Sequence, residues 1–388
     1  MPAPNFSHRI NQALQSRREK GLERKIRPVI GGNQTELECQ GRRYFNFSSN
    51  DYLGLANDPE LVKAWQQGLS VYGSGSGASP LVTGFTYAHQ NLEASLCDWL
   101  GYERAILFNS GFSANQAVLF SLLEKDDLLL QDKLNHASLM EAGMLSPASM
   151  KRFRHNDTNH LNTLLNSDCA NLVVTEGVFS MDGDIAPLKA IQDKCLDRAW
   201  LVVDDAHGIG VLGKEGRGSC ETAQITPDIL VVTFGKAFGL SGAAVLCRHN
   251  TGDYLTQFAR HHVYSTAMPP AQAHTLTHAV EMIRGQQWRR DNLVELNQLY
   301  EELLSDLPQY RETQTPIKPF VIGKSEATVK SANYLRQQGL WLTAIRPPTV
   351  PNNTARLRIT LTANHTKKQI KTLAAGLRQA IEKQGDAS

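Results

Sequence analysis

Short apolar runs alternate with amphipathic stretches through the middle of the chain. The runs are rich in Val, Ile and Leu and end in polar or glycine-containing segments, which is the pattern of buried strands. They occupy residues 105–108, 128–130, 172–175, 200–203 and 229–232. Between the runs, helical periodicity recurs, and the alternation predicts an α/β fold with a mostly parallel sheet covered by helices. Residues 243–247 are a further candidate strand, antiparallel to the rest.

The two ends of the chain show different patterns. Residues 5–27 carry apolar side chains four positions apart on a basic background, which predicts an amphipathic surface helix. Residues 36–47 predict a short hairpin, and residues 285–305 predict a long helix. Beyond that helix, strand-like and helical stretches predict a smaller α+β domain at the C-terminus. We therefore expect three parts, an N-terminal segment at 1–47, a large α/β domain at 48–284 and the C-terminal domain at 285–388.

Composition narrows the class of protein. The chain has 388 residues, with 41% hydrophobic and 20% charged residues, which is typical of a large globular protein. A formal net charge of +2 gives no electrostatic reason to expect nucleic-acid binding. No apolar stretch is long enough for a membrane span, and the first ten residues show no signal-peptide core. The six cysteines form no CxxC pair, so we expect reduced thiols and a cytoplasmic protein.

Reactive side chains follow two of the predicted strands. Lys236 comes soon after the run at 229–232, and Asp204 and His207 follow the run at 200–203. The carboxyl ends of parallel strands are where α/β folds bind ligands. An aspartate and a lysine together suit pyridoxal 5′-phosphate (PLP), because the lysine forms a Schiff base and the aspartate keeps the pyridine nitrogen protonated. Taken alone, Lys236 would more simply be a solvated loop lysine.

Other polar segments leave alternatives open. The stretch after 105–108 begins a helix at Ser110 and Gly111, where free amides suit a phosphate, although the serines there could equally be ordinary N-caps. His136 could stack on a flat cofactor or be structural. The loop GSGSGA at 73–78 lacks the preceding strand of a dinucleotide site. The stretch HNDTNH at 155–160 has no cysteine partner, so no metal site is expected.

The ordered series of motifs resembles the α-oxoamine synthases, PLP enzymes of fold type I. The resemblance covers essentially the whole chain, and its C-terminal part points to the members that serve biotin biosynthesis. The motifs are SSNDYLG at 48–54, GSGSGAS at 73–79, SGFSANQA at 110–117, NHAS at 135–138, TEGVFSMDGD at 175–184, DDAHGIG at 204–210, TFGKAFG at 233–239, YSTAMPP at 264–270, IRPPTVP at 345–351 and ARLRITLTANH at 355–365.

The resemblance implies roles for individual residues. Lys236 would bind PLP covalently, Asp204 would pair with the pyridine nitrogen, and His207 would hydrogen-bond the ring oxygen. His136 would stack on the ring and assist the chemistry. Further cofactor contacts are expected from Gly111, Phe112, Ser180 and Thr233, and from Thr266 of the neighbouring subunit in a homodimer. Arg358 would bind the amino-acid carboxylate, with Arg24, Asn50 and Thr349 near the substrates.

The resemblance also implies the reaction. L-alanine would condense with a pimeloyl thioester, carried by CoA or by an acyl carrier protein, and lose CO₂ to give 8-amino-7-oxononanoate. The nearest alternatives are glycine-using relatives such as 2-amino-3-ketobutyrate CoA ligase or 5-aminolevulinate synthase. A serine-using sphingolipid synthase fits less well, because no membrane anchor is predicted. A non-catalytic regulatory protein of the same fold is a further alternative, disfavoured because Lys236, Asp204 and His207 are all present.

Overall fold

The computed structural model describes residues 6–385. The outermost residues of the predicted end segments, 1–5 and 386–388, lie outside the described residues. The centre of the molecule is a sheet with the strand order β3-β9-β8-β7-β6-β4-β5. Its strands are β3 (Arg104–Phe108), β4 (Leu128–Asp132), β5 (Ser149–Phe153), β6 (Asn171–Glu176), β7 (Trp200–Asp204), β8 (Ile229–Thr233) and β9 (Ala243–Cys247).

The sheet is mostly parallel, as the sequence predicts. Strands β4 to β8 run parallel, whereas β9 is antiparallel to both β3 and β8. Every residue of β4, β6 and β8 is buried, which explains why these strands are continuous apolar runs rather than alternating ones. The edge strand β5 was not predicted, because its sequence SMKRF is polar and mostly exposed.

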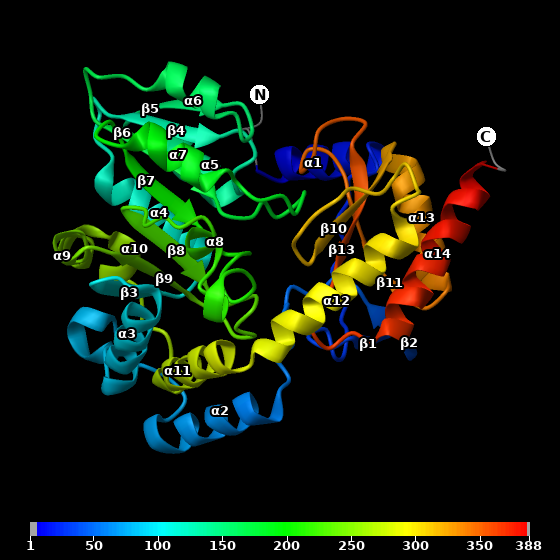
Figure 1. Cartoon of the computed structure of the whole chain (residues 1–388), viewed down its shortest axis with the longest axis horizontal. Helices are drawn as coiled ribbons and strands as arrows, with labels where there is room; N and C mark the ends of the chain where they lie inside the picture. Colours follow the sequence, from blue (N-terminus) through cyan, green and yellow to red (C-terminus); the bar gives the residue numbers. More distant parts are fainter. Residues whose placement is uncertain (1–5, 386–388) are drawn as a thin grey trace.

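Helices cover both faces of this sheet and create two cores (Figure 1). Val173 and Val203 belong to one core, and their neighbours Val174 and Val202 belong to the other, because side chains alternate along a strand. The helices around the sheet are α3 (Tyr87–Leu100), α4 (Gly111–Leu122), α5 (Ala137–Leu145), α6 (Thr158–Leu164), α7 (Leu188–Cys195), α8 (Ser219–Thr222), α9 (His249–Phe258) and α10 (Arg260–Val263), with short helical turns at Pro80–Gly84 and Lys214–Gly216.

Three long helices lead away from the sheet. Helix α11 (Pro270–Gly285) packs against α2 (Pro59–Tyr72) and α3. It begins at Pro270, the second proline of the YSTAMPP motif, where a missing amide costs nothing. The predicted long helix is α12 (Gln287–Leu304), which runs from the end of α11 to the C-terminal part of the chain (Figure 1).

The C-terminal part contains an antiparallel sheet with the order β10-β13-β12. Its elements are β10 (Ile317–Gly323), α13 (Ser325–Gln337), β12 (Thr343–Ile345), β13 (Ala355–Thr360) and α14 (Lys367–Gly385). The predicted hairpin is β1 (Glu36–Cys39) and β2 (Arg42–Asn46), and β2 pairs in parallel with β11 (Leu340–Trp341). The N-terminal hairpin therefore joins the C-terminal part of the chain.

The N-terminal helix is shorter than predicted. Helix α1 (Phe6–Glu19) has no buried residue, and the chain leaves the helix before Gly21, which has a φ of +62°. Glycine adopts this left-handed conformation without the steric penalty that a side chain would meet. None of the helices within residues 6–385 is both long and apolar enough to cross a bilayer.

Candidate functional site

A cavity of about 270 Å³ lies where the parallel strands β4, β6, β7 and β8 end. The chain reverses at these ends, so loops from several βα units meet there. The residues that line the cavity are Asn109, Ser110, Gly111, Phe112, Asn115, His136, Ser138, Glu176, Asp204, Ala206, His207, Thr233, Gly235, Lys236, Ser241 and Gly242. The sequence-predicted residues of the 110, 136, 204 and 236 regions are thus brought together.

Asp204 faces this cavity and is held there by hydrogen bonds. Its Oδ2 accepts a hydrogen bond from Nδ2 of Asn115 at 2.6 Å, and its Oδ1 accepts one from the amide of Ala206 at 3.0 Å. The adjacent Asp205 instead accepts hydrogen bonds from the amide and hydroxyl of Ser219, and burial raises its pKa to about 7. The two neighbouring carboxylates therefore have different surroundings, and only Asp204 lines the cavity.

Lys236 also lines this cavity, and its Nζ lies 3.3 Å from Oγ1 of Thr233. Burial lowers the pKa of the lysine, and the carboxylates of Asp204 and Glu176 oppose that shift only in part. A lysine amine with a lowered pKa is a better nucleophile towards a carbonyl. The solvated-loop alternative for this lysine does not fit these surroundings.

His136 presents its ring between the strand end and the first turn of α5. Its Nδ1 is 2.8 Å from Oγ of Ser138, and Phe112 meets the ring edge-on at a centroid distance of 6.5 Å. Burial lowers the pKa of His136, which favours the neutral ring. A neutral imidazole can lie flat against an aromatic ring without a desolvation cost for a charge of its own.

The N-terminus of α4 forms the end of the cavity next to Thr233. Ser110 is the N-cap, because its Oγ accepts the amide of Ser113 at 3.1 Å. The first amides of a helix have no partner inside the helix, and the helix dipole favours an anion there. A Cβ on Gly111 would lie 2.5 Å from Cγ2 of Thr233, so glycine is required for this close approach of the helix start to Thr233. The same turn can therefore have a serine N-cap and still bind an anion.

A second group of side chains lies beside the cavity. Arg358 of β13 donates from Nε to the carbonyl of Ser180 at 2.7 Å and from Nη1 to Oδ1 of Asn50 at 2.9 Å. Tyr52 has its hydroxyl 2.5 Å from Nδ1 of His207. Burial raises the pKa of Tyr52 to about 12, with Arg358 opposing that shift, and burial lowers the pKa of His207 well below its usual value. The C-terminal sheet thus brings Arg358 to residues of the large sheet.

Three further predicted residues, like Arg358, Asn50 and Ser180, are not among those that line the cavity. Thr266 contributes its backbone carbonyl, which accepts a hydrogen bond from Nδ2 of Asn109 at 2.8 Å. Arg24 and Thr349 are exposed. Their segments nevertheless meet, because Nη1 of Arg346 donates to the carbonyl of Gly21 at 2.6 Å.

Sequence reasoning missed four polar residues of the site. Asn115 and Ser138 bond each other at 2.9 Å behind Asp204, and Glu176 lies at the end of β6 with its Oε1 buried and unpaired. Asn115, Ser138 and Tyr52 lie inside the motifs at 110–117, 135–138 and 48–54, so a search for partners of Asp204 and His207 among motif residues would have found them. Glu176 also lies inside a motif, TEGVFSMDGD at 175–184, but nothing in the sequence indicated that its side chain would line the cavity.

The residues of the cavity fit PLP. A carboxylate for the pyridine nitrogen, a buried amine for the aldehyde and a helix N-terminus for the phosphate all line one space. The N-terminus of α4, which lines the cavity beside Thr233, is the structural observation that favours a phosphate there. Within the described part of the chain, no three His, Cys, Asp or Glu side chains lie close enough to hold a metal ion.

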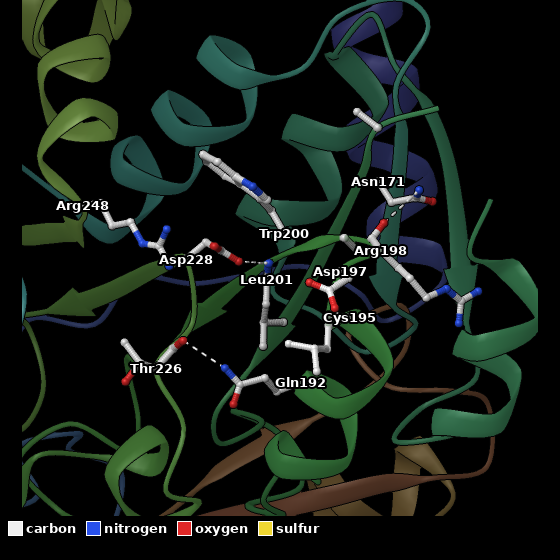
Figure 2. Close-up of a pocket in the computed structure, with 13 residues that line it drawn as sticks. Asn171, Gln192, Cys195, Asp197, Arg198, Trp200, Leu201, Thr226, Asp228 and Arg248 are labelled. Carbon is white, nitrogen blue, oxygen red and sulfur yellow. Dashed lines mark hydrogen bonds between the residues drawn. The ribbon is translucent and has the colours of Figure 1, made fainter. Parts of the chain in front are cut away.

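A second cavity, of about 500 Å³, lies at the opposite edge of the sheet (Figure 2). It is lined by Asn171 and Trp200, the first residues of β6 and β7, and by Asp228, which precedes β8. Its polar groups serve the fold, since Oδ2 of Asp228 accepts the amide of Leu201 at 2.8 Å and Gln192 donates to the carbonyl of Thr226 at 3.0 Å. None of the predicted site residues lines this cavity.

Comparison with known proteins gives consistent results. Residues 42–377 match the family model of aminotransferase class I and II. The 8-amino-7-oxononanoate synthase of Vibrio campbellii is 68% identical over 379 residues, which cover 97% of this chain and 99% of the relative. The serine palmitoyltransferase of S. paucimobilis, solved with a bound PLP–myriocin aldimine, has a TM-score of 0.90 at 27% identity, covering 98% of this chain and 100% of that one. The structure of 8-amino-7-oxononanoate synthase from Francisella tularensis has a TM-score of 0.77 at 30% identity, covering 88% of this chain and 98% of that one.

Proposed function

The chain belongs to the 8-amino-7-oxononanoate synthases, within the class I and II aminotransferase family of fold type I, and we propose that its reaction takes place in the cavity around Lys236. The enzyme is a PLP-dependent acyltransferase of biotin biosynthesis. It condenses L-alanine with a pimeloyl thioester and releases CO₂ and the free thiol. The observation that carries the placement is that Asp204, Lys236 and the N-terminus of α4 line one cavity.

Residues from several strand ends would hold the cofactor. Lys236 would bind it covalently, the carboxylate of Asp204 would pair with the pyridine nitrogen, and the first amides of α4 with Thr233 would hold the phosphate, since all of these groups line the cavity. When bound, PLP supplies an electron sink that stabilises negative charge on the amino-acid Cα. Asn115 orients the carboxylate of Asp204 through its 2.6 Å hydrogen bond. His136 would pack against the ring face, and His207, whose Nδ1 lies 2.5 Å from the hydroxyl of Tyr52, would hydrogen-bond the ring oxygen.

The substrates meet the chain's own residues in a defined order. Arg358 binds the carboxylate of L-alanine, with Asn50 holding the guanidinium in place. Lys236, once its amine is released, takes the Cα proton, for which its lowered pKa suits it. His136 would hydrogen-bond the carbonyl oxygen delivered by the thioester. After CO₂ leaves, Lys236 returns a proton to the new Cα position.

The acyl donor would approach along the segments that Arg346 joins. Arg24 and Thr349 lie on these segments and are exposed, as residues that meet a large substrate must be. CoA and an acyl carrier protein both present the pimeloyl group as a thioester, so either carrier satisfies this chemistry. Arg24 would supply positive charge to the anionic parts of the donor.

We also propose that the enzyme is a cytoplasmic homodimer in which Thr266 reaches the phosphate of the neighbouring subunit. Its backbone already lies at the edge of the cavity beside Asn109. Nearby apolar side chains are exposed, among them Val82 and Tyr264 at 72% and 75%. An exposed apolar surface of this kind favours a protein interface. All six cysteines are free thiols, which suits a reducing compartment.

Amino-acid selectivity tests the proposal against its nearest rival. The purified PLP-loaded enzyme is supplied with pimeloyl-CoA and with L-alanine, glycine or L-serine, and products are identified by mass spectrometry. We expect turnover with L-alanine and a single borohydride-reduced peptide modified at Lys236. Turnover with glycine alone would instead assign the chain to a 2-amino-3-ketobutyrate CoA ligase type of activity, and modification at another lysine would overturn the assignment of the site.

A further inference from the structure

The imidazole of His155 lies between two carboxylates from different parts of the fold. Its Nδ1 is 2.9 Å from Oδ1 of Asp132, and its Nε2 is 2.7 Å from Oδ2 of Asp184. An ionised carboxylate only accepts hydrogen bonds, so each ring nitrogen must donate one. Only the doubly protonated ring donates from both nitrogens. The geometry therefore requires an imidazolium that joins two carboxylates.

One of these carboxylates shapes the turn that carries His136. Asp132 is the last residue of β4 and is fully buried. It accepts the amide of Leu134 on Oδ1 and the amide of Asn156 on Oδ2, both at 2.8 Å. These hydrogen bonds fold the turn after β4 around the side chain of Asp132, and His136 lies at the end of that turn. A shift of Asp132 would move the ring of His136.

The other carboxylate belongs to the loop that holds Arg358. Asp184 closes a tight turn in which the amide of Phe179 donates to the Asp184 carbonyl at 3.0 Å. The carbonyl of Ser180, inside this turn, accepts Nε of Arg358 at 2.7 Å. The ring of Phe179 also contacts His155 edge-on at a centroid distance of 4.4 Å. The turn around residues 179–184 therefore links His155 to the guanidinium of Arg358.

We propose that His155, as an imidazolium, is a positioning residue that fixes the spacing between His136 and Arg358. This inference rests on the proposed function, in which His136 packs on the cofactor ring and Arg358 binds the alanine carboxylate. His155 touches neither the cofactor nor the substrate. It acts by joining the turn after β4 to the turn after β6, so that His136 and Arg358 keep a fixed spacing.

Electrostatics supports a permanent charge on His155. Burial alone would lower its pKa, but the hydrogen bonds and charges of Asp132 and Asp184 outweigh burial and raise the pKa to about 10. These two aspartates are the charged groups that face the ring. A neutral replacement would leave two carboxylates opposed across a small gap, and their repulsion would push the two turns apart.

Binding of L-alanine to the PLP-loaded enzyme, followed by absorbance titration, tests this role without turnover. We expect His155→Gln to bind L-alanine about tenfold more weakly, because a small displacement of a binding group is costly. His160→Gln is the matched control, since His160 lies nearby in α6 and its Nδ1 accepts the amide of Arg154 rather than bonding either aspartate. It should bind L-alanine as the unmodified enzyme does.

The possible results distinguish a failure of the His155 inference from a failure of the proposed function. If His155→Gln lowers the thermal midpoint but leaves alanine affinity unchanged, His155 is only structural and the inference is wrong. If His155→Gln does not fold, Asp184→Asn carries the test, because its carboxylate is partly exposed and the substitution keeps its size. That variant should weaken alanine binding severalfold, and unchanged affinity would also overturn the inference. Failure of the unmodified enzyme to bind L-alanine would instead overturn the proposed function, on which the inference rests.

Discussion

Asp204 and Asp205 show how two identical, neighbouring side chains acquire different chemistry. Asp204 points into the cavity and bonds Asn115, whereas Asp205 points away and bonds Ser219. The strand pattern alone predicts this, since consecutive residues at a strand end face opposite sides. The partners were not predictable, because Asn115 lies 89 positions from Asp204 and no local pattern joins them. At this scale the sequence predicts the reactive groups and the structure supplies what orients them.

The first residue-scale prediction concerns charge on Asp204. In Asp204→Asn the side chain keeps its shape and can still accept from Asn115, but it no longer stabilises a protonated pyridine nitrogen. We expect turnover to fall about 100-fold or more, as when one electrostatic stabiliser of a reacting centre is removed. Asp205→Asn is the matched control and should keep most of the activity. Steady-state kinetics decides, and equal losses in both variants would remove the special role of Asp204.

The second residue-scale prediction concerns Arg358. Its guanidinium is held by Ser180 and Asn50, so it presents a fixed donor geometry that a lysine cannot reproduce. We expect Arg358→Lys to raise KM for L-alanine about 100-fold, within the range for losing a hydrogen-bonded charge pair. Arg356→Lys, on the same strand but paired with Asp182, is the control. An unchanged KM for L-alanine in Arg358→Lys would place the carboxylate elsewhere.

At the scale of elements, burial decides which strands the sequence reveals. The strands that are buried along their whole length, such as β6 and β8, are visible as apolar runs. The edge strand β5 is not, because only Phe153 among its residues is buried. Short helices such as α6, with seven residues, are similarly difficult to recognise because they carry less than two full turns of periodicity. The elements that carry the cavity are of the first kind.

The turn from β3 into α4 makes a testable prediction about cofactor affinity. A methyl group at Gly111 would lie within 2.5 Å of Thr233, so either the helix start or Thr233 must move. We expect Gly111→Ala to weaken PLP binding about tenfold, measured by titrating the apoprotein with PLP. Gly285→Ala is a suitable control, because nothing lies within 4 Å of a Cβ there. Equal PLP affinity in Gly111→Ala and the unmodified enzyme would argue against a phosphate at this turn.

At the scale of the whole molecule, contacts between the chain's ends complete the site. Strand β2 pairs with β11, and Arg358 of β13 reaches Asn50 across 308 positions. Such pairings leave no trace in local periodicity, so the sequence predicted a separate N-terminal segment and C-terminal domain without showing how they meet. The ordered series of motifs in the resemblance, rather than any local pattern, is what suggested Arg358 as a site residue.

His365 makes this junction sensitive to acid. It is buried, its Nε2 donates to the carbonyl of Asn46 at 3.0 Å, and its Nδ1 accepts the amide of Thr362 at 3.0 Å. Burial lowers its pKa to about 4, from 6.5 in the unfolded chain. The unfolded chain therefore binds this proton more readily, so stability is complete above pH 6.5 and is lost as the pH falls towards 4. The loss from this group is about 3 kcal/mol.

Thermal or chemical unfolding between pH 7 and pH 4 measures this effect. In His365→Gln the titrating group is gone, so the fall in stability over this interval should be shallower than in the unmodified enzyme, although the variant is less stable at pH 7. His249→Gln is the control, because His249 is exposed on the surface. Parallel pH profiles for His365→Gln and the unmodified enzyme would show that the junction does not titrate through His365.

The fate of the alanine carboxyl carbon tests the central claim most directly. The enzyme is incubated with pimeloyl-CoA and L-alanine labelled with ¹³C at the carboxyl group, and both CO₂ and the amino-ketone product are analysed by mass spectrometry. We predict one labelled CO₂ for each unlabelled 8-amino-7-oxononanoate, and neither product from Lys236→Ala. Label retained in the ketone product, or equal turnover by Lys236→Ala, would contradict a decarboxylative condensation at Lys236.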